Sequence, residues 1–122
     1  MESRPTILIV EDEPSLREGL VDLLSREGHT VEAVGDGEAA LARGSDPSIQ
    51  MMLLDLMLPD RNGLQVLPEI RRLDPHLPVV VITAYSSLET AIDAMREGAF
   101  HYVPKPFKNE ELHSILQRWL QR

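Results

Sequence analysis

Cysteine is absent from the 122 residues of this sequence, which excludes disulfide bonds and thiolate metal sites. No apolar run comes near the ~20 residues that a membrane-spanning helix requires. The first residues, Met1–Pro5, lack the long apolar stretch of a secretory signal. These absences predict a cytoplasmic protein that does not contact a membrane.

Positive charge is also scarce, because 12 lysines and arginines stand against 20 acidic residues and the formal net charge is −8. Direct binding to nucleic acid rests on cationic contacts with phosphate, so this composition disfavours it. The acidic balance fits protein partners or cations, and it is equally compatible with a role in solubility alone. A length of 122 residues suits one domain spanning 1–122.

Short apolar segments alternate along the chain with amphipathic ones, which indicates alternating strands and helices. Strands are predicted at Thr6–Val10, Thr30–Val34, Ile49–Leu54, Val79–Ile82 and Phe100–Val103. Helices are predicted from Pro14 to a stop at Gly28, from a cap at Asp36 through Arg43, over Gly63–Leu73, along the stripe Leu88, Ala91, Ile92 and Met95 as far as Gly98, and from about Asn109 with Leu112, Ile115, Leu116 and Leu120 on its inner side.

Five strands alternating with five helices predict an α/β protein with a doubly wound parallel sheet. The first, third and fourth strands are the most apolar, so we expect them at the centre of the sheet. Thr30–Val34 is more polar and is expected at an edge. This arrangement favours the flavodoxin-like strand order 2-1-3-4-5. Ligands of such sheets bind outside the carboxyl ends of the strands, so functional residues are expected there.

Acidic residues follow two of the central strands. Glu11 and Asp12 come after the first strand, and Asp55 comes directly after the third. Carboxylates a few ångströms apart repel one another, and Mg²⁺ with its oxygen ligands relieves the conflict. The backbone carbonyl of Met57, two residues beyond Asp55, is a further candidate ligand. The acidic residues after the first strand, taken alone, have an alternative explanation, because acidic residues at the start of a helix interact favourably with the helix dipole.

The fourth and fifth strands supply two more polar groups, the hydroxyl of Thr83 and the ammonium of Lys105. Three carboxylates, one Mg²⁺ and Lys105 sum to a charge of about zero, and phosphorylation of Asp55 would bring the sum to about −1. The set therefore suits an anionic acyl phosphate when the metal is bound. A carboxylate nucleophile needs no general base, and positioning and charge neutralisation dominate phosphoryl transfer.

Four segments in order resemble the receiver domains of bacterial two-component response regulators. They are ILIVEDE (7–13), LLDLMLPDRNG (53–63), VVVITAY (79–85) and YVPKPF (102–107). Four such motifs in register, across essentially the whole chain, are far more specific than one. The segment 83–107 is especially similar to the receivers of NtrC-like transcriptional activators.

The resemblance implies a role for each candidate residue. Asp55 would accept a phosphoryl group from a sensor histidine kinase or a phosphotransfer protein and lose it slowly by autodephosphorylation. The implied metal ligands are Glu11, Asp12, Asp55 and the carbonyl of Met57. Thr83 would follow the phosphoryl group, Lys105 would supply the counter-charge, and Tyr102 would be the switching aromatic. In this family the peptide bond between Lys105 and Pro106 is usually cis.

The family also suggests an output. Phosphorylation would change the face made by the fourth helix, fifth strand and fifth helix, which would control an output domain or a homodimer. NtrC-like proteins usually carry an ATPase domain and a DNA-binding domain after the receiver. Here the sequence ends at Arg122, and it is compatible with a receiver from a longer protein or with a single-domain regulator. The first motif has Glu-Asp where many members have Asp-Asp, which leaves two alternatives for Glu11: direct contact with the metal or contact through water.

Three other classes are compatible with parts of the pattern. A flavodoxin would need a phosphate loop rich in small residues after the first strand, where Glu11–Glu13 would repel the flavin phosphate instead. A haloacid-dehalogenase-type phosphatase would carry a second aspartate at the position of Met57. A degenerate receiver acting only as a binding module is disfavoured by the presence of Asp55, Thr83 and Lys105.

Overall fold

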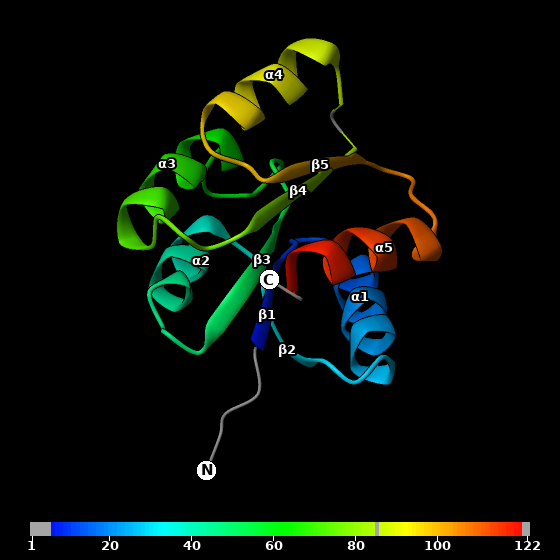
Figure 1. Ribbon diagram of the computed structural model, residues 1–122. Helices are drawn as coiled ribbons and strands as arrows, with labels where there is room; N and C mark the ends of the chain where they lie inside the picture. Colours follow the sequence, from blue (N-terminus) through cyan, green and yellow to red (C-terminus); the bar gives the residue numbers. More distant parts are fainter. Residues whose placement is uncertain (1–5, 85, 121–122) are drawn as a thin grey trace.

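A parallel sheet runs through the middle of the computed structural model, which describes residues 6–84 and 86–120 (Figure 1). Its strands are β1 (Thr6–Val10), β2 (Thr30–Val34), β3 (Ile49–Leu54), β4 (Val79–Thr83) and β5 (His101–Pro104). They lie in the order β2-β1-β3-β4-β5, and each pairing is parallel. The predicted fold class and strand order are confirmed. Tyr85, the last residue of the third motif, lies outside the described residues.

The burial of the strands follows their composition. β1 and β4 are buried along their whole length, and β3 is buried except at Gln50. The more polar β2 lies at one edge and is half-buried, as predicted. At the other edge, β5 begins at His101, one residue later than expected, where the ladder pairs Val80 with His101. The Phe100 N–H donates to the Val79 carbonyl (2.8 Å) just before it.

Five helices connect and flank the strands in the described part of the chain: α1 (Pro14–Arg26), α2 (Gly37–Gly44), α3 (Gly63–Leu73), α4 (Leu88–Arg96) and α5 (Asn109–Leu120). Side chains just before four of them satisfy free backbone N–H groups, and that of Asn62 accepts from Leu64 in α3. Glu13 accepts from the first turn of α1, Asp36 accepts from Ala39 in α2, and Ser87 accepts from Thr90 in α4. The predicted cap at Asp36 is confirmed. None of the described helices is both long and apolar enough to cross a membrane.

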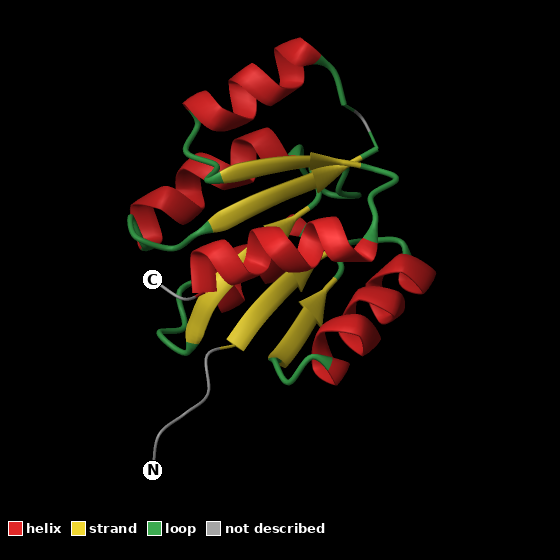
Figure 2. Cartoon of the chain, turned by 45° about the vertical axis from the view of Figure 1, so that its right-hand side comes forward, coloured by secondary structure: helices red, strands yellow, loops and turns green. Residues whose placement is uncertain are grey.

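The helices form a layer on each face of the sheet, α1 and α5 on one face and α2, α3 and α4 on the other (Figures 1 and 2). Two apolar clusters fill the spaces between the layers. Side chains from α1 and α5 such as Leu24 and Leu116 pack on Ile9 and Leu53. Side chains from α2, α3 and α4 such as Val66 and Ala94 pack on the opposite face of the same strands.

The apolar stripe of α4 does not form its buried side. The residues that α4 buries are Thr90 and Ala94, whereas Leu88, Ile92 and Met95 are 79%, 47% and 48% exposed. The helix itself is where the stripe predicted it, but the stripe faces away from the sheet. Small residues allow α4 to lie against its neighbours, so its larger apolar side chains remain on the surface as a face of the kind that marks interaction sites.

Gly63, the first residue of α3, lies against the backbone at the end of β3. A Cβ atom there would lie 2.6 Å from the Leu56 Cα and 2.9 Å from the Asp55 carbonyl oxygen. The Gly63 N–H also donates to the Leu56 carbonyl (2.9 Å). Both obstacles are backbone atoms, so a side chain at this position cannot be accommodated by a change of rotamer.

We expect Gly63→Ala to destabilise the protein by about 1–3 kcal/mol, because the added methyl group forces the backbone apart. Gly19→Ala is the control, since a Cβ at Gly19 in α1 meets nothing within 4 Å. That substitution should stabilise by roughly 0.5–1 kcal/mol through helix propensity. Urea denaturation measures both, and equal stabilities of the two variants would contradict the steric argument.

Candidate functional site

Three carboxylates gather where β1 and β3 end. Val10 and Leu54 are partners in the ladder between these strands, so the next residues, Glu11 and Asp55, lie side by side. One oxygen from each of Glu11, Asp12 and Asp55 lies within 4.8 Å of the others. Glu11 and Asp55 are 1% and 3% exposed, whereas Asp12 is exposed. The crowding predicted at this rim of the sheet is present.

Lys105 joins the two buried carboxylates. Its Nζ lies 2.7 Å from Glu11 Oε1 and 2.7 Å from Asp55 Oδ2. The lysine follows β5, its backbone N–H donates to the Thr83 carbonyl (2.9 Å), and its bond to Pro106 is cis. Burial opposes the lysine's charge, but its hydrogen bonds to Asp55 and Glu11 outweigh burial and raise the pKa of Lys105. The lysine therefore remains an ammonium ion at neutral pH.

The pKa of Glu11 is raised, first by burial and further by the charge of Asp55. Hydrogen bonds from Lys105 and from the Glu13 N–H act in the opposite direction without overcoming burial. One ammonium is thus shared by two buried carboxylates, with a third, Asp12, beside them. A divalent cation bound by oxygen ligands would relieve this excess of negative charge, and the carboxylate set fits Mg²⁺.

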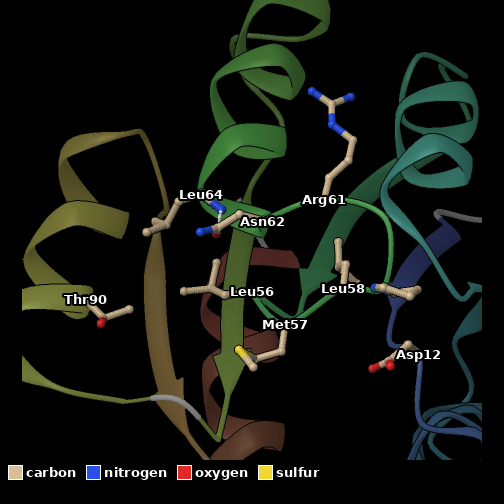
Figure 3. A pocket seen from close by; sticks show the side chains of 9 residues that line it. Asp12, Leu56, Met57, Leu58, Arg61, Asn62, Leu64 and Thr90 are labelled. Carbon is tan, nitrogen blue, oxygen red and sulfur yellow. Dashed lines mark hydrogen bonds between the residues drawn. The ribbon is translucent and has the colours of Figure 1, made fainter.

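The two oxygens of Asp55 have different protein partners. Oδ2 accepts from Lys105, and Oδ1 accepts from the Met57 N–H (2.9 Å). These contacts orient the carboxylate at the end of β3. Asp12 and Met57 line one cleft of about 650 Å³ between the end of β1, the β3–α3 loop and α4 (Figure 3). Asp12, which shares the carboxylate cluster with Asp55, and Leu56, which follows Asp55 in the chain, both line this cleft.

Thr83 and Tyr102 lie on the neighbouring strands. Thr83 ends β4 and is completely buried. Tyr102 pairs with Val81 in the ladder and is half-buried against the cluster that contains Ala94. Burial raises the pKa of the Tyr102 phenol, while its hydrogen bond with the Ser87 backbone works in the opposite direction. Tyr102 is thus in contact with the segment that begins α4.

Sequence reasoning missed two residues near the site. The Arg17 guanidinium donates from α1 to the Glu11 and Asp12 carbonyls (2.9 and 3.3 Å). The Asp60 carboxylate, in the loop between β3 and α3, accepts hydrogen bonds from Gly37 and Glu38 at the start of α2. No local pattern marks either contact, because both depend on how separate elements pack.

Comparison with known proteins places this site in a family. Residues 7–117 match the response regulator receiver domain family. The DNA-binding transcriptional regulator NtrC of Azospirillum brasilense is 36% identical over 118 residues, which are 97% of this chain and 24% of that protein. The chain thus spans about a quarter of this relative's length.

Solved structures agree with the sequence matches. The receiver domain of NtrX from Brucella abortus is 38% identical with a TM-score of 0.87, covering 94% of this chain and 98% of that one. The receiver domain of the sensor histidine kinase PA1611 from Pseudomonas aeruginosa PAO1 is 30% identical with a TM-score of 0.89, covering 98% and 100%. That structure has a magnesium ion coordinated in the active site cleft. The chain therefore belongs to the family of response regulator receiver domains, which act in two-component signalling.

Proposed function

We propose that Asp55 is the phosphoacceptor and that it takes the phosphoryl group from a phosphohistidine of a sensor histidine kinase or a phosphotransfer protein. The contact that supports this most directly is the pair of 2.7 Å hydrogen bonds by which Lys105 holds Asp55 and Glu11 together. The lysine ammonium pairs with the buried carboxylate of Asp55 and orients it beside an open cleft. An ionised, oriented carboxylate is the form that attacks phosphorus.

The transfer conserves atoms and charge without a protein base. An oxygen of Asp55 forms a bond to phosphorus as the bond from phosphorus to the donor imidazole nitrogen breaks, and the imidazole keeps the electron pair. Hydrolysis of the resulting acyl phosphate by water is the slow autodephosphorylation that restores Asp55. Lys105 offsets part of the added negative charge, because it already lies within hydrogen-bonding distance of the acceptor.

Mg²⁺ is the cofactor that the oxygen donors of Asp12, Asp55 and the Met57 carbonyl would hold. When bound, it neutralises charge on the transferred group and orients it. Both oxygens of Glu11 already accept hydrogen bonds, Oε1 from Lys105 and Oε2 from the Glu13 N–H (3.1 Å). This engagement favours contact between Glu11 and the metal through water. The magnesium ion in the PA1611 receiver supports the same class of cation.

The signal would leave the site through β4 and β5. A phosphoryl group on Asp55 adds oxygens that seek donors, and the Thr83 hydroxyl on β4 is the candidate. Movement of Thr83 would open space for Tyr102 to change rotamer, and Tyr102 contacts the start of α4. The domain, proposed to span 1–122, would then present an altered α4–β5–α5 face to an output domain, in the cytoplasm and without touching nucleic acid itself.

The exposed stripe of α4 fits a homodimer at that face. Leu88, Ile92 and Met95 form the uncovered apolar side of the helix. Covering exposed apolar side chains of this size with a second surface lowers the free energy of the system. A two-fold related copy would cover one stripe with the other, because isologous contacts place the same patch on both sides.

The acceptor assignment predicts that Asp55→Asn abolishes labelling, because the amide retains the shape but is not a nucleophile. The measurement is intact mass after incubation with Mg²⁺ and a small acyl phosphate. Asp22→Asn, the same change at an exposed position in α1, should still gain one phosphoryl group. Undiminished labelling of Asp55→Asn would refute the assignment.

The metal assignment predicts that Asp12→Ala removes phosphorylation at low Mg²⁺ while the protein stays folded. Without metal the variant should be at least as stable as the wild type, because one of three crowded carboxylates is gone. Thermal unfolding with and without Mg²⁺ measures this, and the stabilisation by Mg²⁺ should be lost in the variant. Normal labelling of Asp12→Ala at low Mg²⁺ would show that the metal lies elsewhere.

The output assignment predicts that the phosphoryl mimic beryllofluoride increases self-association, since phosphorylation biases the α4–β5–α5 face toward the dimeric form. Sedimentation with and without the mimic measures this. Ile92→Ser should weaken the association, because it removes an exposed apolar side chain without touching the site.

Chemical shifts test the coupling that precedes dimerisation. Thr83→Ala should still accept phosphate but show smaller shift changes between Ser86 and Tyr102 than the wild type. A Thr83→Ala variant that responds fully, or a wild type whose shifts change only around Asp55, would contradict the proposed route.

A further inference from the structure

The loop between β3 and α3 carries Met57. Contacts at the base of this loop and along its length hold the loop in place. At the base, Gly63 donates to the Leu56 carbonyl (2.9 Å). Met57 and Asn62 form an isolated antiparallel bridge across the loop. Arg61 then pairs with Glu69 of α3, at 2.7 Å between Nη2 and Oε2. These contacts hold the side of the loop that faces α3.

The far side of the loop, at its tip, is held by Asp60. Its Oδ1 accepts from the Gly37 N–H (2.8 Å) and its Oδ2 accepts from the Glu38 N–H (3.0 Å), so both carboxylate oxygens are hydrogen-bonded to the first turn of α2. The hydrogen bond from Gly37 is the largest cause that lowers the pKa of Asp60, so the carboxylate is ionised at neutral pH. Such charge-assisted bonds are stronger than neutral ones, and the positive end of a helix dipole adds to them.

The geometry permits this approach because α2 begins with glycine. A Cβ at Gly37 would lie 3.1 Å from Val66 Cγ2 and 3.4 Å from Arg61 Cβ. The loop thus lies directly against the start of α2. Apolar anchoring of the tip is weak by comparison, since Met57, Pro59 and Asp60 are exposed and only Leu58 among them packs on the core.

We propose that Asp60 is a positioning residue for the metal site: it fixes the tip of the β3–α3 loop on α2 and so keeps the Met57 carbonyl where Mg²⁺ can bind it. The inference rests on the proposed function, because it assumes that Met57 is a ligand. Asp12 and Met57 line the same cleft from the end of β1 and from this loop (Figure 3). With the tip released, Met57 would keep only its N–H bond to Asp55 (2.9 Å) and its bridge with Asn62, so its carbonyl would be held less firmly while the carboxylates stay in place.

A second acidic residue on the same helix provides a matched control. Asp36 accepts a hydrogen bond from the Ala39 N–H (2.7 Å), so it also caps α2, but it is not part of the loop. Removing either carboxylate deletes a cap from α2. Only removal of Asp60 detaches the loop. A purely structural role in capping α2 would therefore affect the two variants alike.

The experiment is an NMR titration of the wild type, Asp60→Ala, Asp60→Asn and Asp36→Ala with Mg²⁺ alone, following amide shifts at residues 11–13 and 55–58. We expect Asp60→Ala to raise the dissociation constant for Mg²⁺ by about tenfold, the usual effect of losing a group that orients a metal ligand. Asp36→Ala should remain near the wild type. Asp60→Asn should lie between them, because its amide oxygen can still accept one of the two hydrogen bonds.

The inference holds if Asp60→Ala weakens Mg²⁺ binding by more than about threefold relative to Asp36→Ala, and any smaller difference overturns it. If Asp60→Ala does not fold, the same comparison is made with Asp60→Asn. A wild type that binds no Mg²⁺ would overturn the inference together with the metal site. A wild type that binds Mg²⁺ but is not labelled at Asp55 would overturn only the phosphoacceptor role.

Discussion

The sharing of one ammonium between two buried carboxylates is the constraint on which the rest of this structure depends. Glu11 and Asp55 are adjacent because β1 and β3 are parallel neighbours in register. Two such charges without compensation would oppose folding, since burial penalises each of them and their repulsion adds to the penalty. Lys105 forms an ion pair with each of them at 2.7 Å and so supplies the compensating positive charge. It lies near them because β5 is parallel to the other strands, so the residue that follows β5 is at the same end of the sheet.

The single positive charge of Lys105 does not balance all three carboxylates, and the remaining negative charge suits the site to a cation. Asp12 leaves negative charge in excess, which would favour a divalent cation, and a bound cation would offset the charge of a phosphoryl group. Lys105 also ties this balance to the sheet, because its backbone N–H donates to the Thr83 carbonyl at the end of β4. In the proposed mechanism, a change of charge at Asp55 would reach β4 and β5, where Thr83 and Tyr102 lie.

Backbone contacts hold the loop that follows Asp55. The β3–α3 loop is closed by the hydrogen bond from Gly63 to Leu56 and by the bridge between Met57 and Asn62. Beyond the loop, α4 buries only the small residues Thr90 and Ala94 and exposes its apolar stripe. The fold thus combines a tightly held acceptor with a helix whose larger apolar side chains are available to another surface.

Sequence alone determined the elements and the rim of acidic residues. The bounds of β1 and β3 follow from apolar runs that end at a charged residue, and the central place of β1, β3 and β4 follows from their composition. Tertiary structure decided which side chains meet. Lys105 bonds to residues 94 and 50 positions away, and Asp60 bonds to a residue 23 positions away. The outward turn of the α4 stripe was likewise decided by packing. Periodicity reports a residue's immediate neighbours along the chain, whereas these contacts depend on the distances between packed elements, which no local pattern contains.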